Sequence, residues 1–392
     1  MRLGLVIYDS LETVSGGYLY DRMLVDYLRG QGEQVEIISL PWRNYSRHLG
    51  DNLSPGLFRR LRQAQVDILL QDELNHPSLF WLNRILKASH SKTTASRSPV
   101  AAVQHPPAHP LANIPIISIV HHLRSSENHP RWLNLLYRRV ESWYLSSVDG
   151  FIFNSQTTRR VVQALAGDSQ PAIVALPAGD KLKPELTESE ILARARQEGA
   201  LRLIFVGNLI RRKGLHHLLS ALSQTPRGAI NLTVVGRSDL DPAYARQIQH
   251  LVARYDLAAH VRFLGQQTEA ELGVLLRSHH VLVVPSSYEG FGIVYLEGMG
   301  FGLPAIGPSA GGAAEIITQD VNGFLINPDA PAHLSRLLTC LHQDRGRLAE
   351  MSLAARQRYL SHPTWEQTGS QIHTFLKSLA TKTWMDTHES TP

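Results

Sequence analysis

The chain has 392 residues, of which 43% are hydrophobic and 19% are charged. This composition is typical of a folded protein of two or three domains and excludes global disorder. The single cysteine, Cys340, excludes a disulfide framework and a cysteine-rich zinc site, and it indicates a reducing compartment. A formal net charge of +5 is too small to indicate nucleic acid as a partner.

The N-terminus is apolar over its first eight residues, but Asp9 and Glu12 follow at once, which is not typical of a signal peptide. No apolar run approaches the roughly 20 residues that a transmembrane helix needs. We therefore expect a cytoplasmic protein, which could also lie on the inner face of a membrane.

Short β-branched runs alternate with longer amphipathic stretches, the pattern of parallel sheets covered by helices. In the first half we expect a helix at residues 18–29 and strands at residues 2–8, 34–40, 66–70, 114–120 and 150–154. The pattern then restarts, with helices expected at residues 215–223 and 244–255 and strands at 201–206, 231–235, 261–264, 281–284 and 304–307. The sequence thus predicts an α/β protein with two doubly wound, Rossmann-like domains that face each other across a ligand-binding cleft.

The predicted domains are residues 1–180 and 181–364. We expect a helix at residues 365–380 to pack back on the first domain, and residues 381–392 to form a frayed tail. Residues 89–109 are rich in Ser, Thr, Pro and His, and they predict a long loop.

The segment 285–297 follows an apolar strand and opens a helix, with Glu289 before the helix and Glu297 about one turn inside it. Gly290 and Gly292 let backbone N–H groups approach a ligand, and the helix N-terminus favours an anion such as phosphate. One such glutamate is usually a capping group. Two that flank a glycine-rich turn after a buried strand indicate a binding site.

This segment resembles the Glu-(seven residues)-Glu signature of glycosyltransferase family 4, whose members are retaining enzymes of the GT-B architecture. Further motifs stand in the order of the family: Gly302-Leu303-Pro304, Gly311-Gly312, Glu315 and Asn322-Gly323-Phe324. The resemblance covers nearly the whole chain and is strongest over residues 201–328.

The resemblance implies that Glu297 binds the ribose hydroxyls of a nucleotide-diphosphate sugar and that Glu289 contacts the hydroxyls of its sugar. Phe291 and Gly292 would offer backbone N–H groups to the sugar and phosphate, and Ile293 belongs to the same donor-binding set. Ionised carboxylates make stronger hydrogen bonds to hydroxyls than neutral groups do.

A basic turn, Gly207 to Gly214, follows the first strand of the second half. Members of the family have an arginine after this glycine and a lysine five residues later. Lys213 matches the lysine, whereas Asn208 replaces the arginine, so Lys213 with Arg212 would stabilise the departing diphosphate. A solvated basic turn is the alternative. Gly236, after the next strand, would line the nucleobase side.

Two further candidates lie in the first half. Gly16 and Gly17 form a turn before the first helix, a weak signal alone, and the absence of a GxGxxG fingerprint argues against a dinucleotide-binding dehydrogenase. His121 ends a strand where the family has a histidine, and it would orient the donor sugar, with His122 as the alternative. No carboxylate or cysteine stands at ligand spacing in the sequence beside this pair, so we expect no metal.

Five arginines gather in the first half with Trp42, Tyr45 and Phe58 between them: Arg43, Arg47, Arg59, Arg60 and Arg62. This region is either a solvated surface or a contact for an anionic acceptor or a membrane. Asp239 and Asp241 resemble a DxD metal motif, but Pro242 indicates the first turn of a helix instead.

The sequence therefore predicts retaining transfer of a sugar from a nucleotide-diphosphate sugar to a glycan, a lipid-linked or a small-molecule acceptor. His121, Glu289 and Lys213 are the catalytic candidates, and we expect neither a metal nor another cofactor. Two alternatives stay open: another GT-B enzyme, such as an epimerase or a phosphorylase, and a non-catalytic subunit that binds nucleotide sugars.

Overall fold

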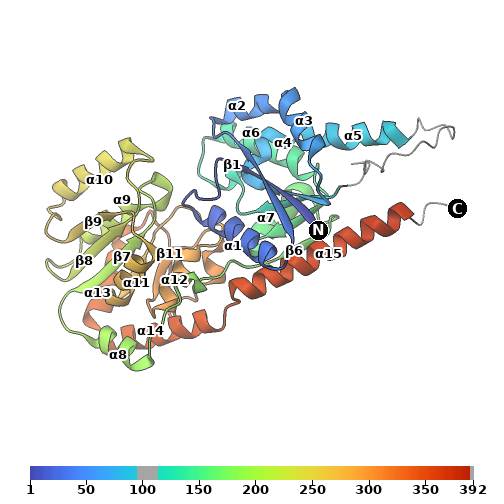
Figure 1. The fold of residues 1–392 in the computed structure, drawn as a ribbon. Coiled ribbons are helices and arrows are strands. Elements are labelled where there is room, and N and C mark those ends of the chain that lie inside the picture. Colours follow the sequence, from blue (N-terminus) through green and yellow to red (C-terminus); the bar gives the residue numbers. More distant parts are fainter. Residues whose placement is uncertain (95–113, 389–392) are drawn as a thin grey trace, which may run out of the picture. The chain divides into compact units, whose positions relative to one another are not determined.

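The computed structural model describes residues 1–94 and 114–388, and Figure 1 shows the course of the chain. The described chain divides into two compact units. Unit 1 comprises Met1–Leu176 and the residues from Glu366 onward, and unit 2 comprises Pro177–Trp365. The sequence places the first boundary at residue 180, four residues beyond the position in the structure.

Unit 1 is built on a six-stranded sheet in which all strand pairs are parallel, in the order β2-β1-β3-β4-β5-β6. Its strands are β1 Arg2–Tyr8, β2 Gln34–Leu40, β3 Ile68–Asp72, β4 Ile116–Val120, β5 Gly150–Phe153 and β6 Ala172–Val174. Its helices are α1 Gly16–Gly30, α2 Tyr45–Asp51, α3 Pro55–Gln63, α4 His76–Leu79, α5 Leu82–Thr94, α6 Arg131–Leu145, α7 Gln156–Ala166 and, from Glu366 onward, α15 Trp365–His388. Short 3₁₀ helices are η1 Glu73–Asn75 and η3 Arg124–Ser126.

Unit 2 repeats the architecture, with parallel strands in the order β12-β11-β10-β7-β8-β9. Its strands are β7 Leu201–Val206, β8 Ile230–Val235, β9 Val261–Gly265, β10 Val281–Val283, β11 Ala305–Pro308 and β12 Gly323–Ile326. Its helices are α8 Glu188–Arg196, α9 Leu215–Leu222, α10 Pro242–Arg254, α11 Glu269–Ser278, α12 Ile293–Gly300, α13 Pro331–Gln343 and α14 Arg345–Leu360, with 3₁₀ turns η4 Asp180–Leu182, η5 Arg211–Lys213 and η6 Gly312–Glu315.

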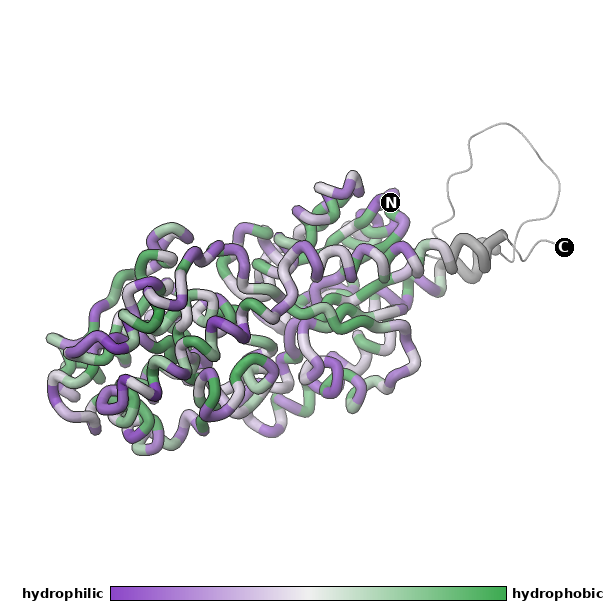
Figure 2. The backbone as a smooth tube through the Cα atoms, turned by 90° about the horizontal axis from the view of Figure 1, so that it is seen from below, coloured by the Kyte–Doolittle hydropathy of each residue, from purple (hydrophilic) through white to green (hydrophobic). Residues whose placement is uncertain are grey.

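The inner strands form the core of each unit because their side chains are apolar on both faces, whereas the edge strands β2, β6 and β9 have exposed or half-buried positions. Every residue of β4 and of β10 is buried, as expected for a parallel sheet with helices on both sides. Hydrophobic and hydrophilic segments alternate along many helices in Figure 2, as expected for helices that bury one face in the protein. The predicted fold class, two doubly wound Rossmann-like domains, is confirmed.

Each sheet has one position where the order of the strands reverses. In unit 1 it lies between β1 and β3, and in unit 2 between β7 and β10. Ligands of doubly wound sheets bind beyond the carboxyl ends of the strands at this point. The topology therefore predicts that ligands bind at the loops that follow β1, β3, β7 and β10.

Two expectations about the ends of helices are wrong. Helix α5 continues to Thr94, where the sequence predicts a loop from residue 89, and residues 95–109 of that loop lie outside the described residues. Helix α15 continues to His388 beyond the predicted end at residue 380, because no proline or glycine interrupts residues 370–388. None of the described helices is both long enough and apolar enough to cross a membrane.

Candidate active site

The loops after β7 and β10 are locked together in unit 2. Gly214 has a φ of +72°, and a Cβ atom there would lie 2.0 Å from the carbonyl oxygen of Pro285, so a larger residue would separate the loops. The Ser287 N–H donates to the carbonyl of Arg212 over 2.8 Å, and the Arg212 guanidinium donates to the carbonyl of Tyr288 over 2.9 Å. The basic turn and the glutamate segment thus form one structure.

Glu289 and Lys213 form an ion pair within that structure, with 2.7 Å between Lys213 Nζ and Glu289 Oε1. The Ser286 hydroxyl donates to the same oxygen over 2.5 Å, and Arg212 lies 3.5 Å from Oε2. Burial alone would raise the pKa of Glu289, but the charges of Lys213 and Arg212 overcome it and lower this pKa to about 2. Burial lowers the pKa of Lys213, and Glu289 opposes that change. The two cations therefore stand beside a permanently ionised carboxylate.

The N-terminus of α12 adjoins this ion pair in the chain. Gly292 caps the helix in the left-handed region, with a φ of +98°, and Phe291 and Ile293 are buried on either side of it. Within the described residues, the N–H groups of Phe291, Gly292 and Ile293 have no hydrogen-bond acceptor. Unpaired N–H groups at a helix start attract anions, as the sequence predicts for this turn.

Glu297 lies on α12 in surroundings different from those of Glu289. The backbone of Gly179 packs against it so closely that a Cβ at residue 179 would lie 3.1 Å from the Glu297 nitrogen. Burial raises the pKa of Glu297 to about 7; the charge of Lys181 opposes this and that of Glu269 adds to it. Lys181 and Glu269 pair with each other. The carboxyl is thus poised between its neutral and ionised forms at neutral pH.

Asn208, which stands where the family has an arginine, joins two loops of unit 2. Its side-chain oxygen accepts the N–H of Arg237 over 3.3 Å, and Leu209 N–H donates to the carbonyl of Arg237 over 2.8 Å. Gly236 packs directly against the backbone of Gly207 and Asn208. The side chain of Asn208 is therefore part of the local structure at the ends of β7 and β8.

The DxD-like pair of unit 2 has structural partners. Asp239 pairs with Arg237 over 2.6 Å, and Asp241 caps α10 by accepting the N–H of Tyr244 over 3.0 Å. Pro242 is the first residue of α10. The predicted role of this segment as a helix start is confirmed.

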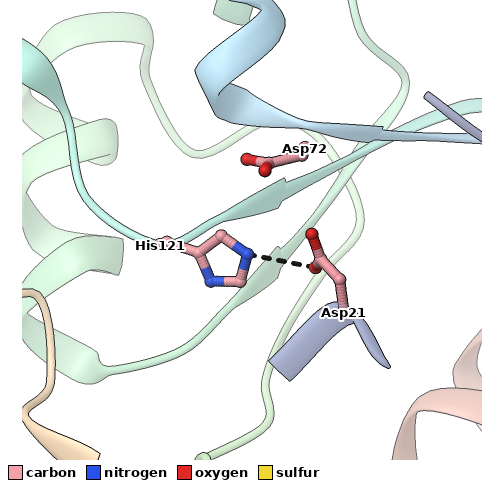
Figure 3. Close-up of side chains that lie close together, drawn as sticks. All are labelled: Asp21, Asp72 and His121. Atoms are coloured by element: carbon pink, nitrogen blue, oxygen red, sulfur yellow. Dashed lines mark hydrogen bonds and ion pairs between the residues drawn. The ribbon is translucent and has the colours of Figure 1, made fainter. Parts of the chain in front are cut away.

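In unit 1, His121 follows β4 and lies in a buried acidic cluster, drawn in Figure 3. Its Nε2 is 3.1 Å from Asp21 Oδ1 on α1, and Asp72 at the end of β3 completes the group. The carboxylate of Glu73 accepts the N–H of His121 over 3.3 Å, and Asn154 donates to the carbonyl of His121 over 2.8 Å. The histidine is therefore fixed through both its ring and its backbone.

Neighbouring charges shift the pKa values of the residues in this cluster. Burial alone would lower the pKa of His121, but Asp21, then Asp72 and Glu73, raise it to about 9. Burial and the charge of Asp21 raise the pKa of Asp72. Asp21 Oδ2 and Asp72 Oδ2 are buried without a hydrogen-bond partner. One ligand atom from each of Asp21, Asp72 and His121 lies within 4.8 Å of the others, so the cluster could hold a metal ion as well as an imidazolium between carboxylates.

The glycine turn of unit 1 lies directly on this histidine. A Cβ at Gly17 would come within 3.1 Å of the His121 ring, and Gly16 is the first residue of α1 after its Ser15 cap. His122 turns elsewhere, with its Nε2 3.1 Å from Glu127. The structure thus joins Gly17 to His121 and leaves His122 outside the cluster.

The arginine-rich region spans α2 and α3. Arg43 pairs with Asp51 over 2.9 Å, whereas Arg47, Arg59, Arg60 and Arg62 are exposed. Phe58 packs on the core, Tyr45 lies 4.7 Å from the Tyr137 ring, and Trp42 is exposed. Only one of the three interleaved aromatic residues therefore faces solvent.

Sequence reasoning missed the residues that surround the predicted ones. These are Ser286, Lys181 and Glu269 in unit 2, and Asp21, Asp72 and Glu73 in unit 1. Asp72 and Glu73 stand at the carboxyl end of β3, beside the strand reversal, and this position could have identified them. Asp21 gave no such signal, because its neighbourhood depends on the packing of α1.

Comparison with known proteins gives the family and the fold type. Residues 18–179 match the model of "Glycosyltransferase Family 4", and residues 188–358 match that of "Glycosyl transferases group 1". Among solved structures, sucrose-phosphate synthase from Thermosynechococcus elongatus has a TM-score of 0.77 at 19% identity, covering 97% of this chain and 99% of that protein. Anabaena HepE, solved with UDP-glucose, has a TM-score of 0.71 at 19% identity, covering 96% of this chain and all of that one. The fold is therefore of the GT-B type.

The chain is also similar in sequence to proteins that are named as sugar-transferring enzymes. Glycogen synthase from Mycobacterium tuberculosis is 28% identical over 261 residues, which are 65% of this chain and 61% of that protein. D-inositol 3-phosphate glycosyltransferase from Salinispora tropica is 30% identical over 190 residues, which are 46% of this chain and 39% of that protein. The alignments thus span less than two thirds of each relative. With both family models matched, the chain belongs to glycosyltransferase family 4.

Proposed function

We propose that this protein transfers a sugar from a nucleotide-diphosphate sugar to an acceptor hydroxyl with retention of the anomeric configuration. The observation that carries the proposal is the group of Lys213, Arg212 and the unpaired N–H groups of α12 at the strand reversal of unit 2. Cations and helix N–H groups together suit a diphosphate, whose negative charge grows as it leaves.

Glu297 binds the donor nucleotide in this proposal. Its carboxylate accepts hydrogen bonds from the two ribose hydroxyls, and the pKa near 7 means that binding selects the ionised form. Gly236 lies at the end of β8, where the proposal places the nucleobase. Relatives and structural neighbours support this class of donor, since HepE was solved with UDP-glucose. Glucose-type donors are accordingly the first to test.

The Lys213–Glu289 pair has two tasks in this chemistry. Glu289 accepts hydrogen bonds from hydroxyls of the donor sugar and keeps Lys213 in place. Lys213 and Arg212 stabilise the departing phosphate. The bond between the anomeric carbon and the phosphate oxygen breaks, and the acceptor oxygen bonds to the same face of that carbon. The acceptor proton passes to the leaving phosphate oxygen, so no covalent enzyme intermediate forms.

Unit 1 contributes His121 and the Gly16–Gly17 turn in this proposal. His121 carries a positive charge at neutral pH because Asp21 raises its pKa to about 9, and it orients the donor sugar by hydrogen bonding. The turn offers backbone N–H groups without a side chain in the way. The arginines of α2 and α3 provide an acceptor-side surface for an anionic glycan or lipid-linked acceptor.

We further propose that the reaction requires no metal ion, because Lys213 and Arg212 supply the positive charge that a cation provides elsewhere. One observation favours the non-catalytic alternative. Asn208 replaces a charged family residue and is engaged with Arg237. Asn208→Arg therefore discriminates: if neither the natural chain nor this variant turns over any donor while both bind nucleotide, the protein is not a transferase.

A thermal-shift screen of UDP-, GDP- and ADP-sugars tests donor binding, because a ligand that binds only the folded state raises the melting temperature. We expect at least one donor to stabilise the natural chain and to lose this effect in Glu297→Ala. The matched control is Glu350→Ala, an exposed glutamate of α14 in the same unit. Equal shifts in Glu297→Ala and Glu350→Ala would refute the assignment of the site.

A further inference from the structure

Helix α6 of unit 1 exposes an apolar stripe that no described residue covers. Trp132 and Leu135 are 71% and 68% exposed, and Leu136 and Trp143 are exposed as well. These residues are spaced three, four and seven apart, so they lie on one face of the helix. Single exposed apolar residues are ordinary, but a contiguous group of this size marks an interaction surface.

Helix α5 extends the stripe. Phe80, just before α5, stacks on Trp143 with 5.7 Å between the ring centroids, and Arg84 donates to the Ser146 hydroxyl over 2.9 Å. Trp81, just before α5, and Ile85 on α5 are exposed. We call six large exposed apolar residues of this region the α5–α6 face: Trp81, Ile85, Trp132, Leu135, Leu136 and Trp143.

Positive charge surrounds the α5–α6 face. Arg131, Arg138 and Arg139 are exposed on α6, and the Arg139 guanidinium lies 5.1 Å from the ring centroid of Trp143. Within the described residues, Arg131 and Arg138 have no ion-pair partner. The one acidic residue of α6, Glu141, is buried and accepts the N–H of Ser125. No exposed acidic side chain on α6 offsets these arginines.

We propose that the α5–α6 face binds the surface of a lipid bilayer that contains anionic lipids. Interleaved tryptophan, leucine and arginine suit the boundary between headgroups and acyl chains, where aromatic rings are half immersed and guanidinium groups meet phosphate. Because α6 has no exposed acidic side chain, the charge of this face complements the phosphates of anionic headgroups. The exposed arginines of α3, which contacts α5, add the same sign of charge beside this face.

This assignment differs from a contact through the region of Arg43 to Arg62. That region has arginines, but its large exposed apolar side chains are Trp42 and Leu53, against six on the α5–α6 face. The α5–α6 face therefore combines charge with the larger apolar surface. The inference does not depend on the transferase activity, and its test measures binding alone.

The experiment is sedimentation of the full chain with phosphatidylcholine vesicles and with vesicles that also contain 30% phosphatidylglycerol. We expect binding only to the anionic vesicles, weakened in 0.5 M NaCl because salt screens the arginines. Trp132→Ala/Leu135→Ala should weaken binding about tenfold by removing apolar contact. Its control is Leu360→Ala/Val274→Ala, two residues of unit 2 that are 58% and 69% exposed.

Arg131→Gln/Arg138→Gln tests the charge separately and should weaken binding roughly 20- to 30-fold, at about fivefold for each arginine. Arg246→Gln/Arg262→Gln, at exposed positions of unit 2, is the matched control and should bind like the natural chain. No binding to anionic vesicles, or equal binding by the test and control pairs, would overturn the proposal. So would a dimer in light scattering that Trp132→Ala/Leu135→Ala dissociates, because the face would then be a protein interface.

Discussion

The Glu289 carboxylate stabilises unit 2 only while it is ionised, and Glu289→Gln removes that contribution. The residue is 6% exposed and accepts hydrogen bonds from Lys213 and Ser286. The glutamine side chain would keep the shape of the glutamate but would leave Lys213 buried without its counter-charge. The substitution therefore isolates the charge of Glu289 from its packing.

The size of the effect follows from the pKa. Lys213 and Arg212 overcome the cost of burial and lower the pKa of Glu289 from 4.5 to about 2. At roughly 1.4 kcal/mol per pKa unit, the ionised carboxylate contributes about 3 kcal/mol. A depressed acid pKa means that this stability is fully present above pH 4.5 and is lost as the pH falls toward 2. The gap between the natural chain and Glu289→Gln should thus shrink by about 2.5 kcal/mol between about pH 6 and about pH 2.5.

Urea unfolding followed by hydrogen-exchange mass spectrometry measures this gap, because peptides from β7 and β10 report on unit 2 alone. Lys213→Met should be strongly destabilising, by about 3–5 kcal/mol, since it leaves the buried Glu289 unpaired. The double variant should lose clearly less than the sum of the two single variants. The exposed Glu350→Gln is the control and should show no pH-dependent gap. A gap for Glu289→Gln that stays constant across this pH range would refute the reasoning.

As the pH is raised toward 7 and Glu297 ionises, donor affinity should increase by up to tenfold per pH unit in titration calorimetry. Glu297→Gln should show no such increase. Asp21→Asn should lower the pKa of His121 in an NMR titration, whereas the exposed Asp26→Asn on the same helix should leave it unchanged; equal effects would contradict the charge argument. Asn208→Arg should speed nucleotide-diphosphate release at least tenfold if it restores a cation beside the leaving group, and an unchanged rate would show that Arg212 and Lys213 suffice. EDTA should change donor turnover by less than twofold; a loss that Mn²⁺ restores would show that the reaction needs a metal ion, for which the Asp21 cluster is the candidate site.

Strands with strong apolar character could be predicted from the sequence nearly to the residue. The expected ranges 2–8, 34–40 and 201–206 coincide with β1, β2 and β7. Two strands were not predicted. β6 has three residues, none of them fully buried, and β12 follows a glycine-free turn and begins with a glycine itself, so neither shows a long β-branched run.

The predicted site residues fall into two groups. Lys213 and Glu289 are separated by 76 residues in the chain, yet family order placed them, with Arg212, at the same pair of loops, and the structure joins all three. The acidic partners of His121 come from α1 and β3 instead. Such a cluster depends on tertiary packing, and periodicity cannot place Asp21 against a histidine 100 residues away.

Product stereochemistry tests the central claim most directly. The natural chain and Lys213→Met should be incubated with the α-linked nucleotide-diphosphate sugar that binds best, with water as acceptor, and followed by NMR from the first minutes. Retaining transfer through the Lys213 site predicts that the α-anomer of the free sugar and the nucleotide diphosphate form together, and that Lys213→Met releases neither. A first-formed β-anomer, or equal release by Lys213→Met, would contradict the account.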